Sequence, residues 1–370
     1  MPIAKTNCFR DFQASQNISS DRQFLADQAF KHHVPLLVKL SLLGALILIF
    51  LVSFALGRYP VNPVELVMGI FNHFLEPAFV ADNLEAAKID RVIFNIRLPR
   101  ILCVMLVGAG LAVAGSAYQG MFRNPLVSPD LLGASAGASL GACLALLVGA
   151  PSWMVPAGAF TGGILAVTLA VWFGRMVRHD PTLSLVLGGI LVSTLFQAGM
   201  SLVKYMADAT EKLPAITFWL MGSFSSINDR DFLAVVIPFI CGFVILMLQS
   251  WKLNVLSFGD EEARSLGVNT RQTRLLTISA ATLLTALSVA IAGVVGWIGL
   301  VVPHLARAIV GPNYHLLLPT AILTGAGFLL IVDDLARLLT TVEIPIGILT
   351  AILGVPFFIV IFRRNMKGWG

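Results

Sequence analysis

Charged residues are scarce in this chain. Asp, Glu, Lys and Arg make up 12% of its 370 residues, whereas typical soluble domains carry about 25%. Apolar residues make up 57%, and the mean hydropathy is +0.86. A soluble globular core does not have this composition, so the sequence predicts an integral membrane protein.

Several chemical signals are also missing. No GxxxxGK[ST] stretch occurs, so phosphates have no backbone cradle and we expect no ATP hydrolysis by this chain. The four cysteines (Cys8, Cys103, Cys143 and Cys241) show no metal-binding spacing. No bound metal or cofactor is therefore expected. The net charge of +5 comes from basic residues that are dispersed and not interleaved with aromatics, which argues against a nucleic-acid partner.

Acidic residues are missing from the middle of the first eight predicted spans. Ion-coupled transporters usually keep buried carboxylates for the coupling ion, so an external energy source is favoured here. An ion-coupled secondary transporter or a channel is the alternative from another class. An integral membrane enzyme is a further alternative, but Asp333, Asp334 and Arg337 are its only candidate cluster. A local ion pair between Asp333 and Arg337 explains that cluster more simply.

The apolar segments predict an all-α, polytopic fold of about ten membrane-spanning helices, since a span needs roughly 20 residues. Nine or eleven spans remain open, because two segments are short. The expected spans are 34–56, 98–120, 131–150, 154–174, 183–206, 231–250, 275–293, 294–311, 317–338 and 346–362. We expect residues 1–33 to form a cytoplasmic tail and 34–370 a single transmembrane domain. The distribution of Lys and Arg places both termini in the cytoplasm.

A short amphipathic helix is expected after the first span. Asn62 is a suitable cap, Pro63 suits the first turn, and Glu65 is placed to reach back to the cap. Val64, Val67, Phe71 and Phe74 then share one face. The helix is too short to cross, so it is expected to lie at the outer interface or to cover a cavity mouth. Simple packing on neighbouring spans is an equal alternative.

Residues 97–141 are rich in Gly, Ala and Ser, which let helix backbones approach closely in lipid. A similar pattern recurs 178 residues later without a gap, pairing Gly115 with Gly293 and Pro125 with Pro303. Five predicted spans separate the copies, so they would point in opposite directions. The pattern predicts the inverted internal repeat that many transporters contain. Chance similarity between small residues is the alternative.

The stretch 257–274 carries six charges in eighteen positions, in a chain of which only 12% is charged. Asp260 is placed to cap a short helix, Gly267 to end it, and Asn269 or Thr270 to cap the helix that follows. Such a structure is larger than a simple connection requires. We expect it to bind a partner outside the membrane, although a solvated loop is the alternative.

Five stretches resemble the permease subunits of type II ABC importers for iron chelates, haem and cobalamin. They are RLPR at 97–100, FRNPLVSPDLLGASAGA at 122–138, GDEEARSLGV at 259–268, GWIGLVVPHLAR at 296–307 and EIPIGILTAILGVPFF at 343–358. The resemblance implies a multi-pass subunit of the bacterial cytoplasmic (inner) membrane that pairs with itself or a close homologue. Its other partners would be two ATPase subunits, which hold ATP and magnesium, and a periplasmic or lipid-anchored binding protein.

The resemblance also implies roles for particular residues. The ATPase would be contacted by Gly259, Asp260, Glu261, Glu262, Ala263, Arg264, Ser265, Leu266 and Gly267. The binding protein would dock on Arg97 and Arg337. The translocation path would be lined by Leu185, Gly188, Gly189, Leu195, Gln197, Ile348, Leu349 and Ile352.

The cargo follows less directly from the sequence, because the binding protein mainly selects it. We expect a ferric siderophore or haem first and cobalamin second. Members of this family that carry oxyanions such as molybdate also exist.

Overall fold

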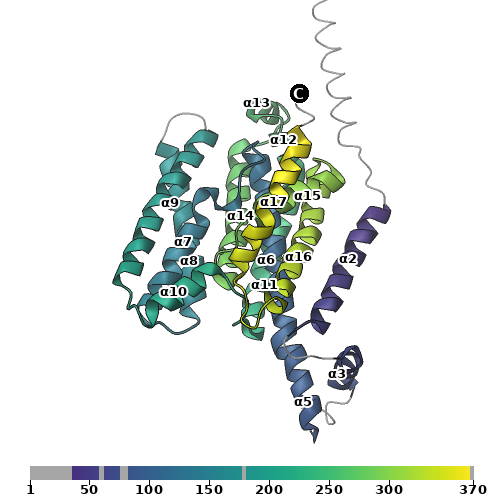
Figure 1. Cartoon of the computed structure of the whole chain (residues 1–370). Coiled ribbons are helices and arrows are strands. Elements are labelled where there is room, and N and C mark those ends of the chain that lie inside the picture. The colour runs from purple at the N-terminus through teal and green to yellow at the C-terminus, as the bar shows by residue number, and fades with distance from the viewer. Residues whose placement is uncertain (1–35, 58–61, 76–81, 177–180, 367–370) are drawn as a thin grey trace, which may run out of the picture.

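The fold, given by a computed structural model, is a bundle of helices running between two ends of the molecule (Figure 1). The structure describes residues 36–57, 62–75, 82–176 and 181–366. The predicted tail at 1–33 lies outside these residues. No strand occurs in the described part of the chain, so the expected all-α class is confirmed.

Seven helices are long and apolar enough to span a membrane. They are α2 (Leu36–Ala55), α6 (Leu98–Met121), α8 (Met154–Met176), α9 (Pro181–Met206), α11 (Asp229–Leu248), α14 (Thr270–Ala292) and α16 (Tyr314–Leu338). Three of the predicted spans are less regular: α7 (Ala134–Leu147), α15 (Ile298–Val310) and α17 (Ile346–Met366). Together these ten helices of the described residues correspond to the ten predicted spans.

The short crossings begin late because irregular segments precede them. The segment before α7 contains one Asn-Pro pair (Asn124-Pro125), one Ser-Pro pair (Ser128-Pro129) and the short helix η2 (Pro129–Leu132). The segment before α15 contains Gly293 and Trp297, both with positive φ. Proline and left-handed residues interrupt a helix, which explains why α7 and α15 are shorter than their hydrophobic segments.

Smaller helices mark the two ends of the bundle. α12 (Ser250–Leu256) and α13 (Asp260–Ser265) lie at one end, here called the α13 end. α5 (Leu84–Asp90), which continues through η1 (Arg91–Arg97) into α6, projects at the opposite end, here called the α5 end. α3 (Pro63–Leu75) lies beside α5 there, and α10 (Lys212–Met221) links α9 to α11.

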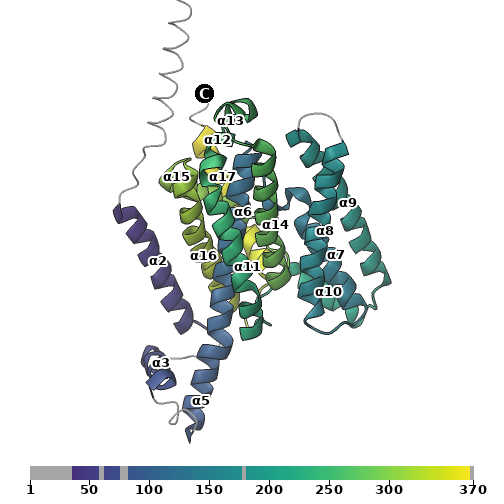
Figure 2. The ribbon, with the colours of Figure 1, turned by 180° about the vertical axis from the view of Figure 1, so that it is seen from behind.

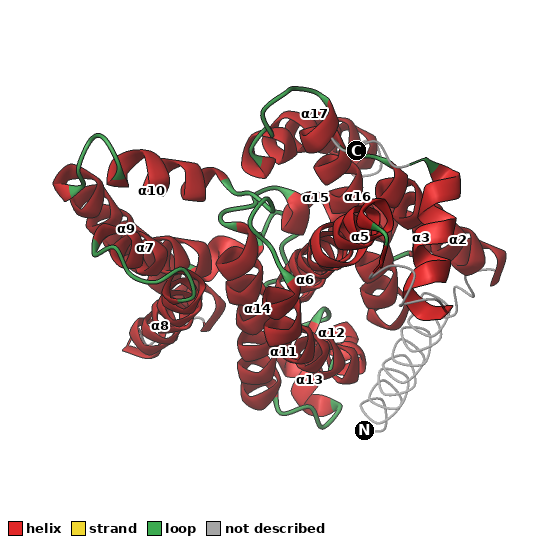
Figure 3. Cartoon of the chain, turned by 90° about the horizontal axis from the view of Figure 1, so that it is seen from below, coloured by secondary structure: helices red, strands yellow, loops and turns green. Residues whose placement is uncertain are grey.

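α6 lies at the centre and is buried along nearly all of its length. α11, α14, α15 and α16 pack around it, and α2 packs on α16 at one edge (Figures 1 and 2). α7, α8 and α9 form a group on the other side and contact the rest through α14 (Figure 3). The small residues of 97–141 therefore face other helices, as expected for an interior segment.

Glycines set the closest helix contacts. A methyl group added at Gly115 of α6 would overlap the carbonyl oxygen of Gly299 in α15, and Gly108 meets Gly325 of α16 in the same way. We expect Gly115→Ala to destabilise the protein by about 1–3 kcal/mol, because α6 and α15 must separate. Gly44→Ala in α2 is the matched control, since nothing lies within 4 Å of that position. Thermal unfolding in detergent tests this, and equal melting temperatures for the two variants would contradict it.

The gapless alignment of the two copies, 178 residues apart, does not pair residues that occupy equivalent places in the helices. Gly115 lies inside α6, whereas its partner Gly293 ends α14. Pro125 follows α6, whereas Pro303 lies inside α15. Small residues recur at many helix contacts, so their coincidence at one spacing does not fix a register. A repeat that relates α6 and α7 to α14 and α15 needs a gapped alignment.

Candidate functional site

The stretch 257–274 forms two successive helix starts, as predicted. α13 ends at Ser265 and is followed by Leu266 and Gly267, the latter with a φ of +78°. The Asn269 side chain caps α14 by accepting from the Gln272 N–H. The prediction that Asp260 caps α13 is wrong. Gly259, with a φ of +134°, occupies the N-cap position, and Asp260 is the first residue of the helix. The Asp260 carboxylate instead accepts a hydrogen bond at 2.8 Å from Arg274.

α13 is attached to the bundle by a small apolar core. Ala263 is fully buried against Val255, Leu256 and Val268. The ion pair between Asp260 and Arg274 ties the start of α13 to α14 on the same side. The short helix therefore has a fixed position, which an unattached solvated loop would not have.

The other side of α13 faces outward. Glu261, Glu262, Arg264, Ser265, Leu266 and Gly267 are exposed, and no ion pair in the described structure involves the charged ones. A hollow of about 420 Å³ separates α13 from the start of α14, with Arg264 and Arg271 on its sides. Exposed charge beside the apolar Leu266 is a surface suited to a protein partner.

A buried ion cluster lies at the α5 end, between α6 and α16. Asp333 is fully buried and accepts from Arg100 at 2.8 Å, while its second oxygen lies 3.1 Å from Arg337. Arg100 also bonds Glu343 at 2.9 Å, in the segment before α17. The expected ion pair between Asp333 and Arg337 is confirmed, but it is one part of a larger network.

The same cluster attaches the end of α2. Arg337 pairs with Asp334 and donates to the Leu56 carbonyl oxygen at 3.0 Å. Asp334 accepts from the Ser53 hydroxyl at 2.6 Å. Four elements that are far apart in sequence are therefore fixed together here: α2, α6, α16 and the segment before α17.

Arg97 and Arg337 are both buried, with less than a tenth of each residue exposed. Arg97 donates to the carbonyl oxygen of Phe54, and Arg337 holds the contacts just described. Docking of a binding protein on these two residues stays a prediction. It requires that each guanidinium exchange an internal partner for one on the docked protein.

A scan against protein-family models matches residues 31–364 to the FecCD transport family. The chain belongs to the FecCD transport family. This agrees with the resemblance described above, since relatives of the chain are named as permease proteins for iron chelatin, hemin and cobalamin. Several relatives and a solved structure support the assignment over most of the chain.

Two relatives and one structure illustrate this similarity. The molybdate import system permease protein MolB of Haemophilus influenzae is 40% identical, covering 87% of this chain and 94% of that protein. The probable iron chelatin transport system permease protein of Helicobacter pylori is 40% identical, covering 81% and 89%. A solved ABC transporter described as of metal-chelate type, in an inward-facing conformation, has a TM-score of 0.79 and 38% identity, covering 89% and 99%.

The expected path residues of this FecCD permease lie on α9 and α17, and some of them are exposed while others are buried. Leu195, Gln197, Ile348 and Ile352 are exposed, and Leu185 is half-buried. Gly188 and Gly189 are buried because they pack on the backbones of Ala170 and Leu131. Leu349 is buried as well. All eight remain predicted path residues, and the two glycines are also helix contacts.

Sequence reasoning missed Arg100 and Glu343 as members of the ion cluster. Arg100 is the last residue of the RLPR stretch, three positions after Arg97. The available signal was the pair of acids in the ninth predicted span, because a carboxylate inside a membrane segment requires a basic partner. Two further polar residues at helix contacts are His304, which bonds the Pro125 carbonyl oxygen, and Arg307, which bonds Gln119.

Proposed function

We propose that this chain, paired with a second copy or a close homologue, forms the membrane pathway for an iron chelate, a ferric siderophore or haem. A binding protein would deliver the cargo at the α5 end. Two ATPase subunits, with ATP and magnesium, would drive transport from the α13 end. The anchored, outward-facing α13 is the single observation that carries this proposal, because it offers a fixed contact for a partner outside the membrane.

The iron chelate is favoured by the similarity to the iron chelatin permease and to the metal-chelate type transporter. The exposed leucines and isoleucines of α9 and α17 would suit a large cargo, because they offer few strong contacts that could trap it. Molybdate is a second candidate, since MolB matches 87% of this chain and the iron chelatin permease matches 81%. Cobalamin follows as a further alternative.

An uptake assay separates these cargoes. The permease, its genomically adjacent ATPase and binding protein would be placed in proteoliposomes and supplied with ferric siderophores, haem, cobalamin or molybdate. We expect ATP-dependent accumulation of an iron chelate. Accumulation of molybdate alone would reject the iron-chelate cargo and leave the importer mechanism intact.

The double change Glu262→Ala, Arg264→Ala is expected to reduce ATPase stimulation by the binding protein several-fold. Both side chains are exposed and unpaired within the described structure, so their loss should spare the fold and affect the ATPase contact. The control is Lys39→Ala, an exposed residue in the first turn of α2, at the edge of the bundle and outside both proposed docking surfaces. The measurement is ATP hydrolysis with and without the binding protein. Unchanged stimulation in the α13 variant would favour the solvated-loop interpretation.

A further inference from the structure

We propose that α3 lies in the surface of the membrane leaflet at the α5 end, with its apolar face in contact with lipid. One side of α3 is covered by protein and the other is not. Six of its apolar residues are 50–72% exposed: Val64, Val67, Met68, Phe71, Phe74 and Leu75. Successive members are one or three positions apart, so they form one continuous stripe on the helix.

The covered side of α3 holds its polar contacts. His73 bonds Asp90 at 2.7 Å and stacks on Phe94, and Gly69 allows close packing against Ile89 and Ile93. Glu65 accepts from the Asn62 N–H at 3.0 Å and closes the cap that the sequence predicted. α3 is therefore oriented by α5, and most of its apolar stripe is left uncovered. Val64 and Met68 lie at the edge of the hollow next to α5, and Phe74 makes an edge contact with Phe94.

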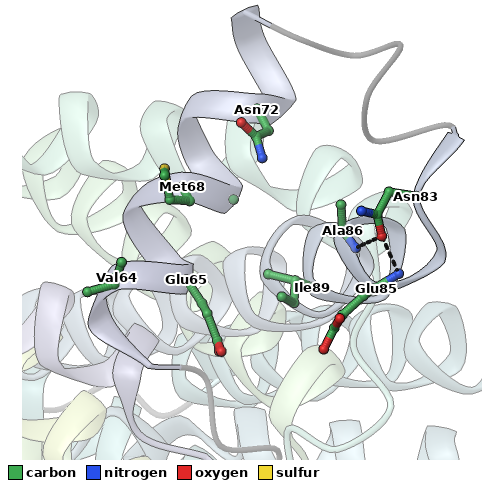
Figure 4. Close-up of a pocket in the computed structure, with 9 residues that line it drawn as sticks. Val64, Glu65, Met68, Asn72, Asn83, Glu85, Ala86 and Ile89 are labelled. Atoms are coloured by element: carbon green, nitrogen blue, oxygen red, sulfur yellow. Dashed lines mark hydrogen bonds between the residues drawn. The ribbon is translucent and has the colours of Figure 1, made fainter.

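A hollow of about 320 Å³ between α3 and α5 is lined by the polar Glu65, Asn72, Asn83 and Glu85 and, at its edges, by Val64, Met68, Gly69, Ala86 and Ile89. Figure 4 shows Glu65 and Asn72 of α3 on the side that faces Asn83 and Glu85 of α5. Water in this hollow would solvate the carboxylates. The helix thus separates a wet side from an apolar side, which is the pattern of a helix lying in a membrane interface.

The apolar stripe of α3 continues the lipid-facing surface of α2, which indicates that lipid also covers the stripe. α2 is a membrane span with most of its leucines exposed, so lipid must cover them. α3 contacts α2 and runs across its direction at the edge of the molecule (Figures 1 and 3). Thirteen residues rise about 20 Å, too little to span a bilayer but suited to its surface. A protein partner centred over the bundle would not need this peripheral apolar stripe.

Nitroxide accessibility tests the proposal on the full chain. In a background without its four cysteines, Phe71→Cys and Phe74→Cys would be spin-labelled in vesicles of phosphatidylethanolamine and phosphatidylglycerol. Asn72→Cys is the matched control from the wet side, and Leu48→Cys of α2 is the lipid reference. Collision with oxygen, which partitions into lipid, would be compared with collision with a water-soluble nickel chelate.

We expect oxygen to collide more often than the nickel chelate at positions 48, 71 and 74, and less often at 72. Nickel access at 71 and 74 equal to that at 72 would overturn the proposal. Loss of access to both reagents at 71 and 74 on adding the binding protein would also overturn it, since a protein would then cover the stripe. The measurement uses no cargo, nucleotide or ATPase, so its failure is distinct from failure of the proposed function.

Discussion

Replacement of Ala263 by proline is expected to lower transport-coupled ATP hydrolysis by about tenfold or more. The Ala263 N–H donates to the Gly259 carbonyl oxygen at 3.0 Å, which is the bond that starts α13. Proline removes that donor and its ring meets the same carbonyl, at a cost of about 3 kcal/mol. α13 would then lose its shape at the proposed ATPase contact while the spans stay intact.

Ala263→Gly is the matched control for this experiment. It keeps the N–H and weakens a helix by about 1 kcal/mol, so it should retain most of the activity. Both variants would be compared for expression, thermal unfolding and ATPase stimulation by the binding protein. Full stimulation in the proline variant would show that the shape of α13 is not needed for coupling.

Replacement of Asp333 by asparagine is expected to give the largest loss of stability, about 3–5 kcal/mol. Asp333 is fully buried, bonds Arg100 and forms an ion pair with Arg337, so its neutralisation leaves two guanidinium groups short of negative charge. A buried charge without a partner costs far more than an exposed one. Thermal unfolding in detergent, read from tryptophan fluorescence, would show a lower melting temperature.

Glu343→Gln is the control for the cluster. Glu343 contacts only Arg100 among the described ion pairs, and its side chain is 20% exposed, so water can replace part of the interaction. We expect a smaller loss of stability from this change than from Asp333→Asn. Equal melting temperatures for wild type and Asp333→Asn would contradict the assignment of Asp333 as the centre of the cluster.

The local structure of the candidate site could be predicted well from sequence. Gly267, Asn269 and the Asn62 cap act through contacts within a few residues, so their chemistry is visible in the chain order. The error at Asp260 has a physical reason: its carboxylate bonds Arg274, fourteen residues later, and glycine is also an acceptable cap. A cap preference does not reveal such a competing partner.

The ion cluster could be predicted only in part, because its contacts are long-range. The pair between Asp333 and Arg337 follows from helical spacing, whereas Arg100 reaches Asp333 across 233 positions. The burial of Arg97 and Arg337 depends on how α2, α6 and α16 pack together. Charge at the end of a predicted span therefore did not show that these two residues are buried.

Transport by the chain in proteoliposomes, with and without its ATPase and binding protein, tests the central claim most directly. The account predicts uptake and ATP hydrolysis only when both partners and ATP are present, because this chain has no phosphate-binding loop. Each omission of one partner should reduce uptake to the level of empty vesicles. Uptake by the chain alone, driven by a proton or sodium gradient, would contradict the account.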